Sequence, residues 1–356
     1  MGKTIRCDVL VVGAGPAGSS AALAARAEGL KVVVCERKKK IGVPVRCAEH
    51  IPALLKAETR IDPSVIVQPV RAMRTILPGG EFIENAAPGY IINRDLFDQG
   101  LAGQCLERGC TIILGASVAG REGEEVQVSL RGGGALRIIP EVVIGADGPH
   151  STVGRWMGCA NLDLIPAVQA RVGLKEPMDR TEVYFLKLIR GGYGWLFPKG
   201  DEANVGIGMR SGQAGDSIYK VLMEFVCRLT GLGKVDLKPR AYMAGWIPVS
   251  PLKRTVSGNM ILVGDAAGHT HPITGAGVPQ AVVCGKMAGQ WAARAAIAGD
   301  MSILRGYEEE WKDLYWESLE RAFRRRLLME SQWGRLEEIL PRCWVGFRQY
   351  YRRADD

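Results

Sequence analysis

Short apolar runs alternate with helical patterns along the first part of this 356-residue chain. The run 8–12 is followed by a helical pattern over 16–28 that ends at Gly29, and a second apolar run occupies 31–35. Short runs of this kind on either side of a helix are typical of parallel strands joined by a βαβ crossover. The pattern therefore predicts a strand, a helix and a second strand that ends at Glu36.

A similar alternation returns between 91 and 155. The segment 91–98 begins a helical pattern that reaches Glu107, and 111–114 is a short apolar run. A longer run, 142–148, ends in Asp-Gly and is followed by Ser151, which is suited to capping a short helix.

The region 167–209 has a different pattern. Polar and apolar residues alternate in stretches such as 181–188 and 203–209, which predicts β-strands. From 299 to 356 the pattern becomes mostly helical. Because strand and helix patterns of the first kind lie on both sides of the β-rich region, we expect that region to be an inserted domain.

Composition is typical of a soluble globular enzyme, with 47% hydrophobic and 24% charged residues. The formal net charge of +8 does not predict a nucleic-acid partner, because the basic residues form no recognised nucleic-acid motif. Arginines and aromatic residues are, however, interleaved near the carboxyl end. They are Arg321, Arg324, Arg325, Arg326, Arg335, Arg342, Arg348, Arg352 and Arg353, with Trp333, Trp344, Phe347, Tyr350 and Tyr351. Such a segment suits an anionic membrane surface, but the favoured interpretation is a solvated helix face with its aromatic residues in the core.

Nine cysteines occur singly, without a C-x-x-C pair, which predicts a reducing compartment and no zinc or iron–sulfur centre. The apolar start, 8–25, is interrupted by Gly13, Pro16 and Gly18, so it is read as strand, turn and helix rather than as a targeting or membrane segment. The sequence therefore predicts a cytoplasmic protein, either free or peripheral at the inner membrane face.

The first turn carries the strongest nucleotide signal. Gly13 suits the tight turn, Gly15 lets the backbone approach a phosphate, and Gly18 lets helix and strand pack closely. Glu36 follows just over twenty residues later, where an acid holds the ribose hydroxyls of an adenosine. These features predict a dinucleotide site.

A second site far along the chain turns this into a flavin prediction. Gly264-Asp265 ends a strand pattern, and a long Ala-rich helix begins near Gly277. The carboxylate suits a ribityl hydroxyl, and the helix start stabilises negative charge on a reduced isoalloxazine by up to ~2 kcal/mol. The Asp147-Gly148 turn is expected at the same cofactor. The predicted cofactor is FAD.

Two further motifs indicate which class of FAD-binding protein this is. Residues 44–49, Pro-Val-Arg-Cys-Ala-Glu, resemble the flavin-side loop of geranylgeranyl reductases, and residues 193–198, Tyr-Gly-Trp-Leu-Phe-Pro, resemble their YxWxFP substrate-pocket motif. Ordered motifs carry the resemblance over about residues 5–300. It implies an FAD-dependent reductase that delivers a hydride from flavin N5 to carbon–carbon double bonds of a polyprenyl, geranylgeranyl-type lipid.

The sequence leaves other activities and more than one electron donor open. A monooxygenase or halogenase on the same fold is the alternative activity, because halogenases carry a tryptophan motif at a similar place. A flavoprotein that only carries electrons is a third hypothesis. The electron donor is NAD(P)H or a protein such as reduced ferredoxin, since hydroxylases of this fold bind NAD(P)H without a second Rossmann unit.

The motifs and the resemblance together give a set of site residues. The expected cofactor-binding residues are Gly13, Gly15, Ala17, Gly18, Glu36, Arg46, Cys47, Ala48, His50, Arg94, Val118, Asp147, Gly264, Asp265, Gly277 and Val278. Tyr193, Trp195 and Phe197 are expected to line the substrate pocket, on one face of a strand.

Cys47 and His50 are the catalytic candidates. Arg46 beside Cys47 favours its thiolate, and His50 stands where the family pattern has glycine, so it either narrows the pocket or donates a proton. His269 and His271 have H-x-H spacing but no third ligand at ligand spacing. A hydrogen bond to the flavin or a proton relay is therefore expected of them rather than a metal site.

The predicted fold class is α/β, a Rossmann-like FAD-binding domain with an inserted antiparallel β-sheet substrate domain and a helical carboxyl-terminal segment. The expected bounds are 1–58, 91–157 and 256–300 for the FAD-binding domain, 59–90 and 158–255 for the substrate domain, and 301–356 for the helical segment.

Overall fold

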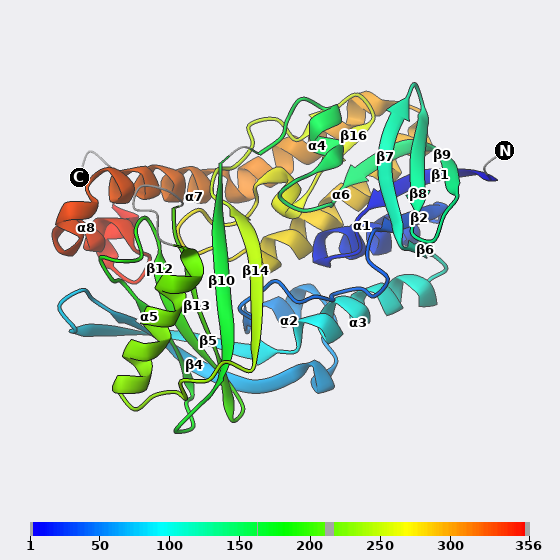
Figure 1. The fold of residues 1–356 in the computed structure, drawn as a ribbon. Coiled ribbons are helices and arrows are strands. Elements are labelled where there is room, and N and C mark those ends of the chain that lie inside the picture. The colour runs from blue at the N-terminus through cyan, green and yellow to red at the C-terminus, as the bar shows by residue number, and fades with distance from the viewer. Residues whose placement is uncertain (1–2, 162, 211–216, 353–356) are drawn as a thin grey trace.

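The computed structural model describes residues 3–161, 163–210 and 217–352, which form two eight-stranded sheets (Figure 1). The strands of the first, sheet A, are β1 (Lys3–Val12), β2 (Val32–Glu36), β6 (Thr111–Leu114), β7 (Ala116–Glu122), β8 (Glu125–Leu130), β9 (Ala135–Gly145), β15 (Val256–Ser257) and β16 (Met260–Leu262). Their order is β15-β16-β9-β1-β2-β6, and the β7–β8 hairpin returns onto β9.

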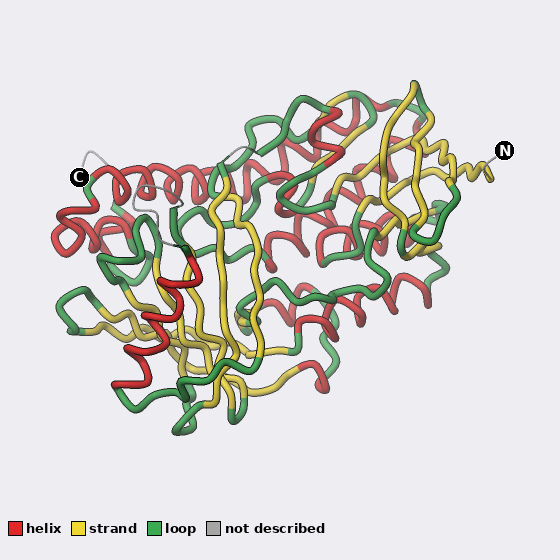
Figure 2. The backbone as a smooth tube through the Cα atoms, viewed as in Figure 1, coloured by secondary structure: helices red, strands yellow, loops and turns green. Residues whose placement is uncertain are grey.

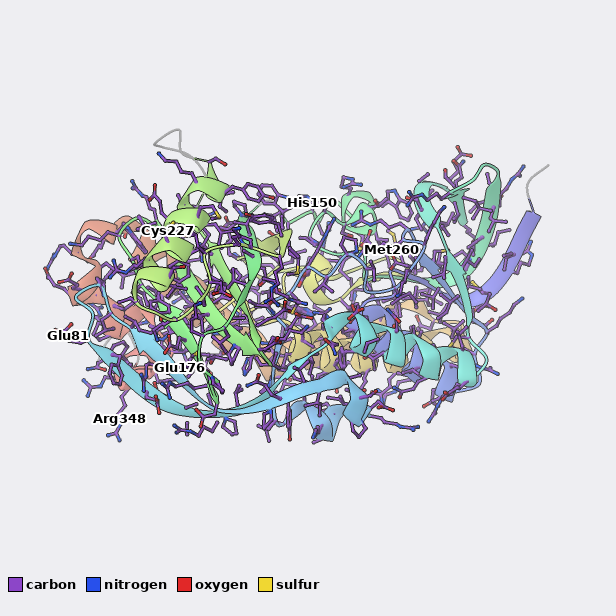
Figure 3. The ribbon with its side chains drawn as sticks, turned by 60° about the horizontal axis from the view of Figure 1, so that its bottom comes forward. Glu81, His150, Glu176, Cys227, Met260 and Arg348 are labelled. Carbon is purple, nitrogen blue, oxygen red and sulfur yellow. The ribbon has the colours of Figure 1, made fainter. Side chains whose placement is uncertain are left out.

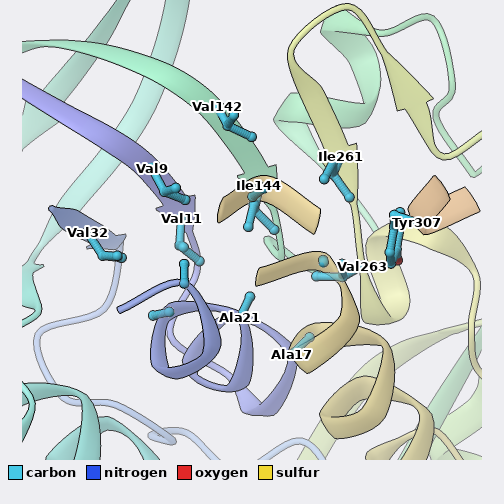
Figure 4. Packing of buried hydrophobic residues seen from close by; sticks show 14 of the residues in the cluster. Val9, Val11, Ala17, Ala21, Val32, Val142, Ile144, Ile261, Val263 and Tyr307 are labelled. Atoms are coloured by element: carbon cyan, nitrogen blue, oxygen red, sulfur yellow. The ribbon is translucent and has the colours of Figure 1, made fainter. Parts of the chain in front are cut away.

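The centre of sheet A is parallel and buried on both faces. Val9 is paired with Val32 on one side and with Val142 on the other. Alternate residues point to opposite faces of a strand, so Val9 packs toward Ala21 of the helix α1 (Pro16–Ala27; Figure 4). Leu10, on the other face, packs toward the β7–β8 hairpin. Cover on both faces explains why these strands read as continuous apolar runs.

The helix α6 (Val278–Ala298) crosses α1 at very short range. A Cβ atom added at Gly285 would lie 2.4 Å from the carbonyl oxygen of Ala17, and one at Gly289 would lie 2.2 Å from that of Ala21. Because no side chain fits at these two positions, the glycines allow the helix backbones to touch. This contact fixes the start of α6 beside the start of α1.

Sheet B is formed by β3 (His50–Pro52), β4 (Ile66–Ile76), β5 (Phe82–Ile92), β10 (Leu164–Gly173), β11 (Arg180–Tyr184), β12 (Tyr193–Lys199), β13 (Glu202–Gly208) and β14 (Ala241–Pro248). Their order is β14-β10-β13-β12-β11-β4-β5-β3, and the pairing is antiparallel except between β4 and β11. The helix α5 (Ile218–Gly231) packs its apolar side on one face. The other face turns toward sheet A and the carboxyl-terminal helices (Figure 2).

The carboxyl-terminal segment is helical, as predicted. It contains α7 (Arg305–Ser331), α8 (Leu336–Cys343) and short 3₁₀ turns at Met301–Leu304, Trp333–Arg335 and Arg348–Tyr351. The remaining helices are α2 (Leu55–Glu58), α3 (Arg94–Glu107) and α4 (Thr152–Trp156), with 3₁₀ turns at Pro63–Val65 and Gly264–Ala267.

The aromatic residues of this segment lie mainly in the core. Trp333, Trp344 and Tyr350 are buried against sheet B, whereas Tyr351 is exposed. Arg321 and Arg324 pair with glutamates one helical turn earlier on α7. Burial agrees with the favoured interpretation of the pattern and removes these three aromatic side chains from any membrane contact. Within the described ranges, no helix combines the length and hydropathy needed to cross a bilayer.

The structure differs from the sequence prediction at three element boundaries. Residues 91–92, expected at a helix start, end β5, and α3 begins only at Arg94. The strand expected over 181–188 ends at Tyr184. The strand β3 lies inside the range 1–58 assigned to the FAD-binding domain, yet it pairs with β5 in sheet B. In each case a long-range pairing decides where the element ends.

Candidate functional site

One cavity of about 800 Å³ lies between the two sheets. Its first wall is the carboxyl edge of sheet A, where β1 and β2 end at Val12 and Glu36. Its second wall is the face of sheet B formed by β10, β12 and β14. His150, which borders the cavity, is labelled in Figure 3. Ligands of open α/β sheets bind at such carboxyl edges.

In the glycine loop, residues 13–18, close packing leaves no room for a side chain at two of the glycines, and the third glycine faces open space. A Cβ at Gly13 (φ +101°) would lie 2.4 Å from the carbonyl oxygen of Ala146, and one at Gly18 would lie 1.9 Å from that of Gly13. A Cβ at Gly15 would meet no atom within 4 Å, because Gly15 borders the cavity. Gly15 is also the N-cap of α1 and leaves the first amides without a side-chain partner. Free amides at a helix start bind anionic phosphate.

Glu36 is held rigidly at the end of β2. Its Oε2 accepts a hydrogen bond from the Ala14 amide at 2.9 Å, and Oε1 accepts one from the Lys38 amide at 2.9 Å. The side chain is buried in the fold but borders the cavity, as does Val118 of β7. A carboxylate has further lone pairs, so Glu36 can also accept hydrogen bonds from a diol.

The second predicted site, 264–278, lines the same cavity. Asp265 accepts a hydrogen bond from the Thr270 hydroxyl at 2.7 Å, and burial raises the pKa of its carboxyl. A Cβ at Gly277, the N-cap of α6, would lie 2.9 Å from that hydroxyl. In the first turn of α6, Gln280 Oε1 is buried and has no hydrogen-bond partner in the described part of the chain. Gln280 borders the cavity, so a ligand N–H would satisfy this oxygen.

The Asp147-Gly148 turn also borders the cavity. The Asp147 carboxylate accepts hydrogen bonds from the Ser151 hydroxyl at 2.5 Å and the Thr152 amide at 2.6 Å. These contacts, with Ser151 as N-cap, start α4. Asp147 borders the cavity while its carboxylate is engaged with α4, and its expected role at the cofactor stays a prediction.

Cys47 lies where the two walls meet, although its charged partner is not the one expected. Its Sγ accepts a hydrogen bond from the Glu49 amide at 3.2 Å and contacts the Arg94 guanidinium. Arg46 is exposed at the rim instead. Burial alone would lower the pKa of Arg94, but Asp98, whose Oδ1 lies 2.7 Å from Arg94 Nε, and Cys47 raise it.

His50 and Ala48 also border the cavity. The His50 ring contacts Phe197 edge to face, with 5.8 Å between centroids, and its Nε2 is buried without a partner. Burial lowers the pKa of His50 to about 4, so the imidazole is neutral at pH 7. Of the two roles expected for His50, this environment favours narrowing of the pocket over proton donation.

The three aromatic residues of β12 share one face, as predicted, and all border the cavity. The Tyr193 hydroxyl donates to the carbonyl of Thr274. Trp195 Nε1 donates to Gln169 Oε1 at 3.1 Å, and Gln169 Nε2 donates to the Cys47 carbonyl at 3.1 Å. One buried amide therefore joins the aromatic strand to the cysteine loop.

His269 and His271 do not border this cavity. His269 is buried against Trp311, with 4.6 Å between ring centroids, and burial lowers its pKa to about 3. His271 accepts a hydrogen bond from the Thr274 amide at 3.2 Å and faces the Tyr350 hydroxyl. Both imidazoles are neutral at pH 7 and lie behind the loop, so the structure does not support a proton relay through them.

Sequence reasoning missed several residues of the cavity wall. Trp344 contacts Tyr193 edge to face at 5.3 Å and donates to the Thr75 hydroxyl at 2.8 Å. Gln169 and Gln280 were missed as well, because single polar residues in a strand or a helix carry no local signal. The carboxyl-terminal segment thus closes the apolar end of the pocket.

Comparison with known proteins agrees with this geometry. The family model for the geranylgeranyl reductase catalytic domain matches residues 163–236, and the model for FAD-dependent oxidoreductases matches residues 8–42. A geranylgeranyl bacteriochlorophyll reductase-like protein from Thermoplasma acidophilum superposes with a TM-score of 0.83 at 29% identity, over 94% of this chain and 92% of that one. A probable FAD-dependent monooxygenase from Pseudomonas aeruginosa shares the fold, with a TM-score of 0.66 at 20% identity over 94% and 99%.

Relatives with full-length similarity decide the family. The digeranylgeranylglycerophospholipid reductase of Methanocaldococcus jannaschii is 34% identical, covering 91% of this chain and 87% of its own. That of Methanothrix thermoacetophila is 35% identical, covering 94% and 89%. With the cofactor edge, the cysteine loop and the aromatic strand around one cavity, the chain belongs to the geranylgeranyl reductase family of FAD-dependent oxidoreductases.

Proposed function

We propose that this enzyme reduces the carbon–carbon double bonds of geranylgeranyl chains carried by a glycerophospholipid, with FAD as cofactor. The observation that carries the proposal is a cavity that the carboxyl edge of sheet A and the aromatic face of sheet B share. Sheet A binds the cofactor and sheet B binds the substrate. The names of the full-length relatives support this substrate class.

The residues at the sheet A edge fit FAD. Gly15 leaves open space beside the free amides of α1, Glu36 offers a buried carboxylate, and Gln280 Oε1 is an orphaned acceptor. Arg94 and Asp265 border the same space with buried side chains. When bound and reduced by the electron donor, the flavin would supply the hydride.

The protein's own residues orient the lipid and supply the proton. Tyr193, Trp195 and Phe197 give an apolar wall that excludes water, and Trp344 closes its end. Cys47 is the better of the two catalytic candidates, because its Sγ lies where the cofactor wall and the aromatic wall meet. His50 narrows the apolar arm beside Phe197.

The lipid enters beside Trp246 on the edge strand β14. This tryptophan borders the cavity, is 47% exposed, and contacts His150 edge to face at 5.8 Å. Tyr242 on the same strand is also exposed. Aromatic side chains with an apolar body and a polar tip suit a membrane interface. These residues support β14, rather than the carboxyl-terminal aromatic residues, as the proposed site of peripheral membrane contact.

The deciding experiment is anaerobic reduction of a digeranylgeranyl glycerophospholipid by FAD-loaded enzyme. Dithionite replaces both donors expected from the sequence, NAD(P)H and reduced ferredoxin. The expected product gains two hydrogens for each double bond, read by mass spectrometry. Trp195→Leu is expected to lower this turnover at least tenfold, whereas Tyr219→Leu, an exposed position on α5, leaves it unchanged.

Two outcomes would contradict the proposal. One is the absence of any two-hydrogen gain under anaerobic conditions. The other is a product that appears only with O2 and carries an added oxygen or halogen, which would establish the alternative monooxygenase or halogenase activity.

A further inference from the structure

Glu49, directly after Cys47 and Ala48, has an unusual backbone and an unusual environment. It is the one non-glycine residue in the described ranges with a positive φ, +68°. Its side chain is also only 1% exposed. Side chains rarely adopt this left-handed conformation, and strained residues of this kind cluster at functional sites.

The Glu49 carboxylate joins both halves of the molecule. Its Oε2 accepts from Arg171 of β10 at 2.6 Å, Lys199 of β12 at 2.7 Å and Asn204 of β13 at 3.0 Å. Its Oε1 accepts from the amide of Arg94, the first residue of α3, at 3.1 Å. One buried anion thereby connects three strands of sheet B to the helix on the cofactor side.

The same contacts hold the backbone around Cys47. Gln169 donates to the Cys47 carbonyl at 3.1 Å, and Asn204 donates to the Ala48 carbonyl at 3.2 Å. The left-handed backbone lets the Glu49 amide face the Cys47 sulfur at 3.2 Å while its side chain faces sheet B. Arg94 also contacts the sulfur, which therefore has two donors.

Stability alone is a weak reason for this arrangement. A buried ion pair is often replaced by apolar residues without loss of stability, and glycine fits a positive φ better than glutamate. Both the buried ion pair and the left-handed backbone disfavour glutamate at position 49. A role in placing Cys47 accounts for a carboxylate that is kept at this cost.

We propose that Glu49 is a positioning residue that clamps the 47–49 loop and holds the Cys47 sulfur between the Glu49 amide and Arg94. This placement keeps the sulfur at the cavity wall beside two N–H donors. Loss of the carboxylate frees the loop, separates the sulfur from its donors and lowers its reactivity. The consequence for catalysis rests on the proposed function, whereas the consequence for the thiol does not.

The test is the rate of iodoacetamide labelling at Cys47 in the folded, FAD-loaded full chain, read by peptide mass spectrometry at one fixed pH. Labelling of Cys227, which is exposed on α5, is the internal reference. Glu49→Gln keeps the side-chain shape and removes the charge, and is expected to lower the Cys47/Cys227 ratio about fivefold.

Glu182→Gln is the matched control. Glu182 is a fully buried carboxylate of β11 that pairs with Lys234 at 2.8 Å on the α5 side of sheet B. Its loss is expected to lower stability but to leave the labelling ratio of Cys47 unchanged. A ratio that falls equally in both variants would overturn the proposal, because general loosening would then explain it.

An unchanged ratio in folded Glu49→Gln would also overturn the proposal. If that variant does not fold, Asn204→Leu decides by the same measure, because it removes the contacts with Glu49 and Ala48 without changing charge. Labelling requires neither lipid nor electron donor. Failure of lipid reduction with a normal labelling result would therefore contradict the proposed function alone.

Discussion

Two alanine substitutions in the glycine loop, Gly15→Ala and Gly18→Ala, should have different effects. The first should weaken cofactor binding, and the second should destabilise the fold. The Cβ of Gly15→Ala meets no protein atom within 4 Å, and the backbone there is extended (φ −76°, ψ −174°), which alanine also adopts. The folded apoprotein should therefore change in stability by less than about 1 kcal/mol, the scale of N-cap effects. The Cβ of Gly18→Ala lies 1.9 Å from the Gly13 carbonyl oxygen. Overpacking against backbone should cost about 3 kcal/mol.

Among the folded variants, FAD affinity should fall more in Gly15→Ala than in Gly18→Ala. The Gly15→Ala methyl fills space beside the free amides of α1, whose interaction with an anion is worth up to ~2 kcal/mol. Loss of that amount weakens FAD binding about 30-fold. Urea unfolding of the apoprotein and titration with FAD, followed by quenching of flavin fluorescence, measure the two effects separately. Gly15→Ala with unchanged FAD affinity, or with a stability loss as large as that of Gly18→Ala, would refute this reasoning.

Three further predictions concern buried and exposed aromatic neighbours of the site. Below pH 6.5 the unfolded chain protonates His269, whereas the folded chain holds it neutral down to its pKa of about 3, so stability falls with falling pH. Between pH 7 and pH 5 the free energy of unfolding, measured in urea, should therefore fall by about 2 kcal/mol less in His269→Phe than in the unchanged protein. The same pH dependence in both proteins would contradict this. Trp344→Ala should lower the free energy of unfolding by about 3–5 kcal/mol and admit longer prenyl chains in the reduction assay, whereas unchanged chain-length selectivity would exclude Trp344 as the end wall. Trp246→Ala should weaken sedimentation with vesicles of the lipid substrate and Tyr351→Ala should not, and the reverse order would return membrane contact to the carboxyl end.

Much of sheet A could be predicted because its signals are local. The apolar run to Val12, the glycine loop and Glu36 lie within one βαβ unit, and the helix cap at Ser151 follows its strand directly. The aromatic face of β12 was equally accessible, since residues two apart in a strand share a face. Such features depend on neighbours along the chain.

The rest of the pocket depends on contacts between distant segments. Gln169 and Cys47 are separated by 122 positions, and Trp344 and Thr75 by 269. No periodic pattern of apolar and polar residues predicts such a contact. The fold brings Arg94 to the Cys47 sulfur, whereas Arg46, its neighbour in sequence, is exposed at the rim, so the expected effect of Arg46 on Cys47 stays a prediction.

The position of the cysteine loop in the topology explains why it needs a charged anchor. The chain leaves sheet A at Glu36 and enters sheet B at His50, so the residues between them belong to neither sheet. Apolar packing is non-directional and would let such a loop settle in several arrangements. A carboxylate with donors from β10, β12, β13 and α3 has one arrangement that satisfies all of them. Because removal of one partner from a buried pair costs about 3–5 kcal/mol, Glu49 restricts the loop to that arrangement and fixes Cys47 between the two walls.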